Sequence, residues 1–273
     1  MEIVRHYSCC ANDDICSLLN QNRIPYQQDD LGNGTIRIYF DISENNPLFP
    51  QLSDISLAKC IIFKKVKYTK KEICTAQWLT CNPTTAKVNL KNQEISFLLK
   101  EQYDSGKARH RVPSGKPFFV SKPLRHNVNQ HFFTSDEATN QIFCTEYAKN
   151  LLNKQDYPLS FNPVLNSKTF LPIGNLFEVC VEHILPLESM DLSNSEETFT
   201  CPGCGAVTFL PPLSLQLRNE YLVNAPAIFR TPSVFSWGGN YSAPITIVSH
   251  DVYIFLSESH LTRGLEFEPI IML

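Results

Sequence analysis

IFCTEYAKNLL at residues 142–152 and TIVSHDVYIFL at residues 246–256 are two copies of one pattern. Each copy begins with strand-forming residues, continues through a Thr or Ser, and then spaces its apolar residues as a helix does. Each ends in Phe-x-Pro followed by Val or Ile, and the second copy has two more residues of loop. Thr145 and Ser249 stand where a helix N-cap belongs, because their hydroxyls can accept hydrogen bonds from the first free amides of a helix.

This repeat predicts the fold class. A strand, a capped helix and a closing strand cannot bury their apolar faces alone, so each copy must pack on something larger. We therefore expect an α+β protein with two related halves, each a small mixed β-sheet with a packed helix. Pro172 and Gly174 interrupt residues 166–175 and place the boundary there. The predicted halves are residues 1–170 and residues 171–273, the second carrying a Cys-x-x-Cys-Gly knuckle.

Local signals predict further elements outside the repeat. The acidic pair Asp13-Asp14 favours the start of a short helix, and strands follow from alternating apolar residues bounded by turn residues. The expected elements are a helix at residues 13–20, a first hairpin with a turn at 31–34 and a strand at 35–42, and strands at 59–68, 73–79 and 176–185.

Composition and charge restrict the function. The chain has 273 residues, 43% of them hydrophobic and 19% charged, which is typical of a folded globular protein. A net charge of -3 gives no electrostatic reason for binding nucleic acid or an anionic membrane. No apolar stretch approaches the ~20 residues of a membrane helix. The first residues show no positive region followed by an apolar run, so we expect a cytoplasmic protein.

Cys201-Pro202-Gly203-Cys204-Gly205 is the strongest candidate for a site. Pro202 restricts one backbone angle and the glycines allow a tight turn, so two thiolates can point at one metal ion. One interpretation is structural zinc, and the other is a tight turn with two free thiols. A redox dithiol is disfavoured, because a strand-like run follows this motif where redox motifs begin a helix.

A closed zinc site needs four ligands, and the sequence contains no second Cys-x-x-Cys. Cys180 and His183 are the nearest further candidates. Their spacing of three puts them on opposite faces of a single strand, which argues against their sharing an ion. The other cysteines are interpreted as small, reduced and buried apolar residues.

No enzyme motif is present. His126 and His131 have no acidic partner at metal spacing, and histidines in a polar loop are usually surface residues. The sequence lacks both Gly-x-x-x-x-Gly-Lys and Gly-x-Ser-x-Gly. We therefore expect no catalytic residues and no small-molecule substrate.

The C-terminal part of the chain resembles a known family. It contains, in order, CPGCG at 201–205, LPPLS at 210–214, IFR at 228–230, IVS at 247–249 and GLEFEP at 264–269. This order is similar to that of the double-CxxCG-motif proteins of bacteria, a family that includes immunity proteins against toxins delivered by kin cells. The repeat also looks like a segment of related polymorphic-toxin immunity families. The likeness covers about residues 140–273 and rests on motif order.

The chain departs from that family in one respect, because it has only the second of the two knuckles. Cys9, Cys10 and Cys16 lack the required spacing. Either this chain has lost the ion, or it completes the site with Cys180 or another residue.

The resemblance implies an immunity protein that forms a stoichiometric complex with a cognate toxin protein. Trp237 and Tyr241 lie in an aromatic, Gly-bearing loop and are candidate partner-binding residues, with core packing as the alternative. Two other functions stay open: a zinc-stabilised scaffold or interaction protein, and an enzyme with an unrecognised site.

The metal hypothesis predicts that protein purified without chelators carries about one zinc per chain, since a structural site adds its binding energy to folding. Replacing both Cys201 and Cys204 with Ser is then expected to lower the melting temperature. Elemental analysis and thermal unfolding measure the two effects. A metal-free preparation would contradict the zinc hypothesis and leave the immunity hypothesis standing.

Overall fold

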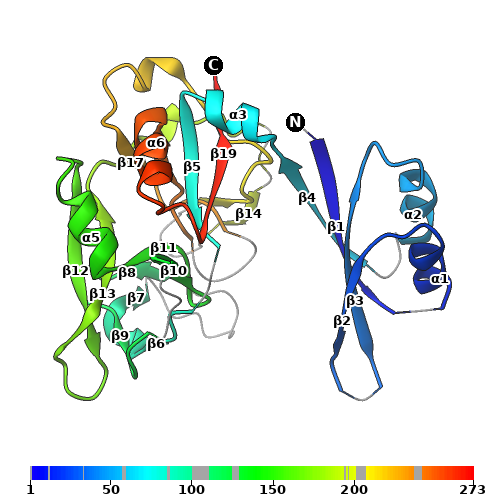
Figure 1. The fold of residues 1–273 in the computed structure, drawn as a ribbon, viewed down its shortest axis with the longest axis horizontal. Helices are drawn as coiled ribbons and strands as arrows, with labels where there is room; N and C mark the ends of the chain where they lie inside the picture. The colour runs from blue at the N-terminus through cyan, green and yellow to red at the C-terminus, as the bar shows by residue number, and fades with distance from the viewer. Residues whose placement is uncertain are drawn as a thin grey trace. The chain divides into compact units, whose positions relative to one another are not determined.

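The fold is α+β, as predicted, with short helices and several small sheets (Figure 1). The chain divides into two compact units, Met1–Glu72 (the N-terminal unit) and Ile73–Leu273 (the C-terminal unit). The computed structural model describes residues 2–11, 13–32, 34–56, 60–84, 87–99, 111–124, 129–193, 195, 197–200, 207–236 and 242–273.

The N-terminal unit is one antiparallel sheet with two helices. Its strand order is β2-β3-β1-β4. Strand β3 therefore lies between β1 and β2, the strands joined by α1, while β1 lies between β3 and β4, the strands joined by α2. Two such split β-α-β motifs make the ferredoxin-like arrangement. The elements are β1 (Glu2–Cys10), α1 (Asp13–Gln21), β2 (Tyr26–Asp30), β3 (Ile36–Ser43), α2 (Phe49–Ser56) and β4 (Cys60–Lys67).

Both helices cover the same face of this sheet (Figure 1). Ile15 and Leu19 are four residues apart and so project from one side of α1 into the core, where Leu52 joins them from α2. The acidic residues Asp13 and Asp14 lie in the first turn of α1, where the helix dipole favours negative charge. The predicted helix, first hairpin and strand at residues 59–68 are confirmed.

The expectation that Cys9 is a reduced, buried thiol is wrong, because Cys9 is disulfide-bonded. Its side chain belongs to the core under the helices. The register of β1 against β4 sets the backbone of Cys9 opposite that of Cys60. Among the described residues, the free cysteines are Cys10, Cys16, Cys74, Cys81, Cys144 and Cys180.

The strand expected at residues 73–79 is wrong in its first part, which belongs to helix α3 (Lys70–Thr75). A capping box starts this helix. The Thr69 hydroxyl accepts a hydrogen bond from the Glu72 backbone amide at 3.2 Å, and the Glu72 carboxylate accepts one from the Thr69 amide at 2.8 Å. The following strand, β5, is Trp78–Pro83.

The first copy of the repeat forms β11 (Ala138–Thr145), α5 (Glu146–Leu152) and β12 (Leu159–Asn166). Strand β13 (Pro172–Val181) pairs antiparallel with both β11 and β12 and so fills the gap between these parallel strands. The sheet order is β10-β11-β13-β12-β9-β6. Its other strands are β10 (Phe132–Ser135), β9 (Phe119–Val120) and β6 (Leu90–Lys91).

The second copy forms β18 (Thr246–Ser249), α6 (His250–Glu258) and β19 (Leu265–Pro269). Here the filling strand is β5, which pairs antiparallel with β18 and with β19. The sheet order is β17-β18-β5-β19, where β17 is Ile228–Arg230. Both copies are therefore split β-α-β motifs, although the filling strand follows the first copy and precedes the second.

The two copies have the same strand register, which confirms the repeat as a structural one. In each copy, one residue of the filling strand pairs with the N-cap residue, and the residue three positions further along pairs with the Phe of the Phe-x-Pro sequence. The matched pairs are Thr145–Leu176 with Ser249–Trp78, Phe161–Val179 with Phe267–Cys81, and Pro163–Phe177 with Pro269–Leu79.

The two N-caps are also confirmed. The Thr145 hydroxyl accepts a hydrogen bond from the amide of Ala148, and the Ser249 hydroxyl accepts one from the amide of Val252, each at 3.4 Å. Both capping residues have extended backbone angles, as N-caps require.

The predicted boundary at residues 170/171 lies in the turn between β12 and β13. Pro172 is the first residue of β13, where a missing amide hydrogen is tolerated, and Gly174, at φ 92°, lies in an irregular stretch of the β12–β13 pairing. The two residues thus shape a hairpin. Strand β5 comes from the predicted first half and completes the sheet of the second.

The C-terminal unit also contains several short elements outside these two sheets. No helix in the described ranges is long and apolar enough to span a membrane. The elements are α4 (Gln93–Ser96), β7 (Phe97–Leu99), β8 (Arg111–Pro113), β14 (Glu197–Thr200), β15 (Val207–Phe209), β16 (Gln216–Leu217), β20 (Ile271–Met272) and the 3-10 turns Leu187–Ser189 and Asn219–Tyr221.

Replacing the cap of α6 by Ser249→Ala is expected to lower the free energy of unfolding by about 1 kcal/mol, because the amide of Val252 loses its acceptor. Ser257→Ala is the matched control, since Ser257 is exposed in the same helix and caps nothing. Urea unfolding followed by circular dichroism measures both. Equal stabilities for the two variants would show that the cap contributes nothing.

Candidate functional site

A buried carboxylate, that of Glu178, lies on a central strand of the larger sheet. Glu178 lies on β13, which has a neighbour on each side in its sheet. Phe177, Val179 and Val181 pack in the core that contains α5 and α6, so Glu178 points to the opposite face. Leu176, on that same opposite face, is part of another apolar core. Only 8% of Glu178 is exposed.

Amide side chains from both neighbouring strands bind this carboxylate. The Gln141 side-chain amide on β11 donates a hydrogen bond to one oxygen at 2.7 Å. The Asn162 amide on β12 donates to the other oxygen at 3.1 Å and also lies 3.1 Å from the Cys180 sulfur. We call Glu178, Gln141, Asn162 and Cys180 the β13 polar cluster. It joins the three strands of the first split motif through side chains.

Burial dominates the electrostatics of this cluster. It raises the pKa of Glu178, and the hydrogen bonds from Asn162 and Cys180, together with the nearby charge of Arg230, oppose the shift only in part. Burial, aided by the charge of Glu178, raises the pKa of the Cys180 thiol to about 12. Arg230 lies on β17, and its Nε atom is buried without a hydrogen-bond partner among the residues that the structure describes.

These environments determine what the cluster can do. A thiol with a pKa of about 12 is almost entirely protonated at neutral pH and is a poor nucleophile. Both carboxylate oxygens of Glu178 already accept hydrogen bonds from amides of the protein. The cluster therefore suits a polar network that aligns three strands, with a carboxyl group whose protonation responds to pH.

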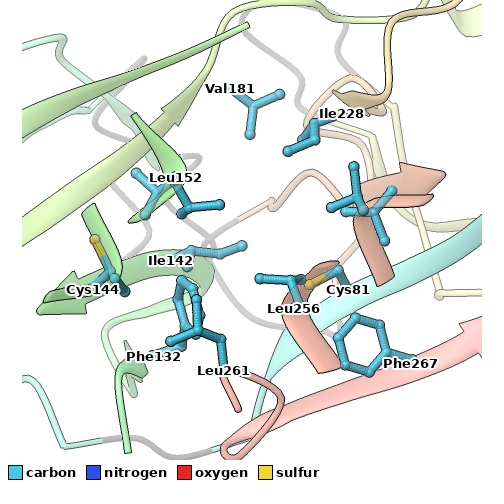
Figure 2. Close-up of a cluster of buried hydrophobic side chains, with 14 of the residues drawn as sticks. Cys81, Phe132, Ile142, Cys144, Leu152, Val181, Ile228, Leu256, Leu261 and Phe267 are labelled. Atoms are coloured by element: carbon cyan, nitrogen blue, oxygen red, sulfur yellow. The ribbon is translucent and has the colours of Figure 1, made fainter. Parts of the chain in front are cut away.

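A small cavity lies on the other side of this sheet, between the two copies of the repeat. Figure 2 shows Leu152 from α5 and Leu256 from α6 among the side chains that pack there. The cavity is about 40 Å³, and its lining is apolar except for Thr246 and the thiol of Cys81. Such a space has too few polar partners to bind water, so we interpret it as a packing gap.

The four candidate metal ligands fall into two groups. Cys201 and Cys204 lie outside the described residues. Cys180 contacts Asn162, whereas the exposed ring of His183 lies edge-on to Phe229, with ring centroids 6.4 Å apart. Their side chains thus contact different residues. Within the described residues, no group of three or more His, Cys, Asp or Glu residues could hold a metal ion.

The strands that flank the knuckle form a hairpin. Strands β14 and β15 pair antiparallel, with Thr200 opposite Val207. Residues 201–206, which include Cys201 and Cys204, follow β14 and precede β15 in the sequence. The two partner-binding candidates, Trp237 and Tyr241, lie outside the described residues, as does His126. His131 supports the cap of α5, because its Nδ1 lies 2.9 Å from the Thr145 hydroxyl.

Sequence reasoning missed two features. The first is the β13 polar cluster, whose signal was a single carboxylate inside the apolar run Leu176-Phe177-Glu178-Val179. A strand buried on both faces reads as such a run, so an acidic residue within it must find partners. The second is the turn between β12 and β13, where Phe170 and Leu171 are exposed. Two apolar residues beside Pro172 in a polar turn were its signal.

Comparison of the chain with protein-family models, with curated proteins and with solved structures finds no match.

Glu178→Gln is expected to raise the melting temperature at pH 8 and to raise it less, or not at all, at pH 4. The pKa of Glu178 is higher in the folded chain than its unfolded value of about 4.3, so its contribution to stability is full below that pH and is lost as the pH rises through the folded pKa. Each kcal/mol gained corresponds to roughly 2–4 °C.

The exposed Asn162 amide can rotate to accept a hydrogen bond from the new Gln side chain. Glu182→Gln is the control, because Glu182 is exposed just beyond the end of the same strand. Thermal unfolding between pH 4 and pH 8 measures both variants. Parallel pH profiles for wild type and Glu178→Gln would contradict the assignment.

Proposed function

We propose that this chain is an immunity protein that binds and neutralises a cognate bacterial toxin, delivered by a polymorphic or contact-dependent system, through a stoichiometric complex. One observation carries the proposal. The repeat that resembles segments of toxin-immunity families is a structural repeat, with two split β-α-β motifs in the same register. The two segments that carry this resemblance are therefore the ones that form the split motifs of the C-terminal unit.

The described side chains favour a binder over an enzyme. Glu178 and Cys180 of the β13 polar cluster form hydrogen bonds with each other and with Asn162. Burial raises the pKa of both groups and so favours their protonated forms. The cavity between the two copies is small and apolar. A binder needs a rigid scaffold under an exposed surface, and the paired motifs supply that scaffold.

Neutralisation by complementarity requires a surface of ordinary interface size. A stable complex buries ~1,600 Å² in total, and a few aromatic or Arg side chains carry most of the binding energy. Structural zinc at Cys201 and Cys204 remains part of the proposal, since the paired strands β14 and β15 enter and leave that segment. The zinc would stabilise the fold and take no part in chemistry.

The test begins with affinity capture of the tagged protein from a lysate of its own source and identification of any polypeptide that co-purifies in equal amount. The C-terminal domain of that polypeptide is then expressed alone and together with this chain. We expect growth arrest in the first case, normal growth in the second, and a one-to-one complex with a dissociation constant in the nanomolar range, ~10⁻⁹ M. A captured polypeptide that is not toxic, or whose toxicity this chain does not relieve, would refute the immunity function.

A further inference from the structure

The end of β12 and the turn that follows it, residues 166–171, expose two large apolar side chains next to each other. Phe170 is 53% exposed and Leu171 is 64% exposed. Figure 1 shows this turn at the lower end of the β12–β13 hairpin. We call residues 166–171 the hairpin tip. Exposed apolar residues are ordinary when scattered, but an adjacent pair on a projecting turn resembles the anchors of protein interfaces.

Hydrogen bonds hold the hairpin tip in one conformation. The side-chain oxygen of Asn166 accepts from the amides of Lys168 and Thr169 at 2.9 and 3.1 Å. The backbone of Asn166 exchanges hydrogen bonds with Phe170 and Leu171 at 2.9 and 2.8 Å. Ser167 is tied to the neighbouring β9 and β6 segments, because its amide donates to the Val120 carbonyl and its carbonyl accepts from Asn92.

The backbone of Phe170 is left-handed, with φ at 59°. Glycine or asparagine adopts this conformation more readily than an aromatic residue does. The strained conformation nevertheless holds the ring beside Phe119, edge-on at a centroid distance of 5.3 Å, while about half of the residue stays exposed. A side chain already held in its binding position loses little entropy when a partner covers it.

The charge around the hairpin tip is positive. Lys168 lies in the turn, Lys91 precedes the Asn92 that binds Ser167, and Lys122 lies two residues after Val120; all three are exposed. Glu94, in the short helix after Asn92, is the nearest carboxylate along these segments. None of the three lysines forms an ion pair with another described residue. A complementary surface is therefore an apolar pocket rimmed by carboxylates.

We propose that the hairpin tip is the element that docks on the toxin, with Phe170 and Leu171 inserted into an apolar pocket of that protein and Lys168 facing acidic residues at its rim. This inference rests on the proposed immunity function and names the surface that performs it. It differs from the surface predicted at Trp237 and Tyr241. The partner chemistry is a folded protein domain with an acidic, apolar-floored cleft.

The test uses the full-length chain and the toxin domain captured with it. Phe170→Asn removes the ring but keeps a residue that tolerates the left-handed backbone. Leu171→Asp places a charge on a side chain that is already mostly exposed. We expect the double variant to raise the dissociation constant at least about 30-fold, as loss of interface anchors does, and to fail to protect cells. Its melting temperature should match wild type.

Lys168→Glu tests the charge complementarity separately. A rim charge acts mainly on the association rate, so this variant should associate more slowly, and its rate should depend less on salt. Two matched controls are available. Val223→Asp changes another apolar residue of the same unit, 73% exposed, and Lys154→Glu reverses another exposed lysine. Both controls should bind as wild type does.

The outcomes separate the two proposals. If wild type binds the toxin and the double variant binds with the same affinity, the hairpin tip is not the docking element and the immunity function stands. If wild type binds no toxin, both proposals fall. If Phe170→Asn alone disturbs folding, Leu171→Asp decides the question, because its side chain is 64% exposed.

Discussion

Antiparallel pairing of one strand between two parallel strands is the interaction on which the three larger sheets of the described chain depend. A β-α-β crossover leaves a gap one strand wide, and its unpaired amides and carbonyls must be satisfied before the apolar faces can be buried. In the sheet of the N-terminal unit, β3 fills the gap between the parallel strands β1 and β2, and β1 fills the gap between the parallel strands β3 and β4. In the C-terminal unit β13 and β5 fill the gaps, and α5 and α6 share the resulting core.

Features with a local cause were predictable from the sequence. The caps Thr145 and Ser249 and the Phe-x-Pro strands follow from residues close together in the chain, and the structure places them as expected. The strand that fills each motif was not predictable, because pairing of β5 with β18 and β19 is decided by contacts between distant residues. The capping box at Thr69 and Glu72 was a local signal that alternating apolar residues in the next segment obscured.

The candidate site shows the same division. A buried carboxylate at Glu178 can be suspected from its apolar neighbours, but its partners Gln141 and Asn162 are 37 and 16 residues away in sequence and meet it only when β13 lies between β11 and β12. The hairpin tip depends on local turn chemistry, yet its conformation also needs β9 beside it. The sequence therefore shows which residues have unusual chemistry, but not which distant residues contact them.

The placement of β5 has a consequence for biosynthesis. Roughly 160 residues separate β5 from β18 and β19, so at ~5–20 residues per second the ribosome makes β5 on the order of ten seconds or more before its pairing strands exist. The first copy is contiguous and can fold as it emerges. Until β18 and β19 are made, both edges of β5 lack their native partners, so its backbone amides and carbonyls are open to pairing with other strands.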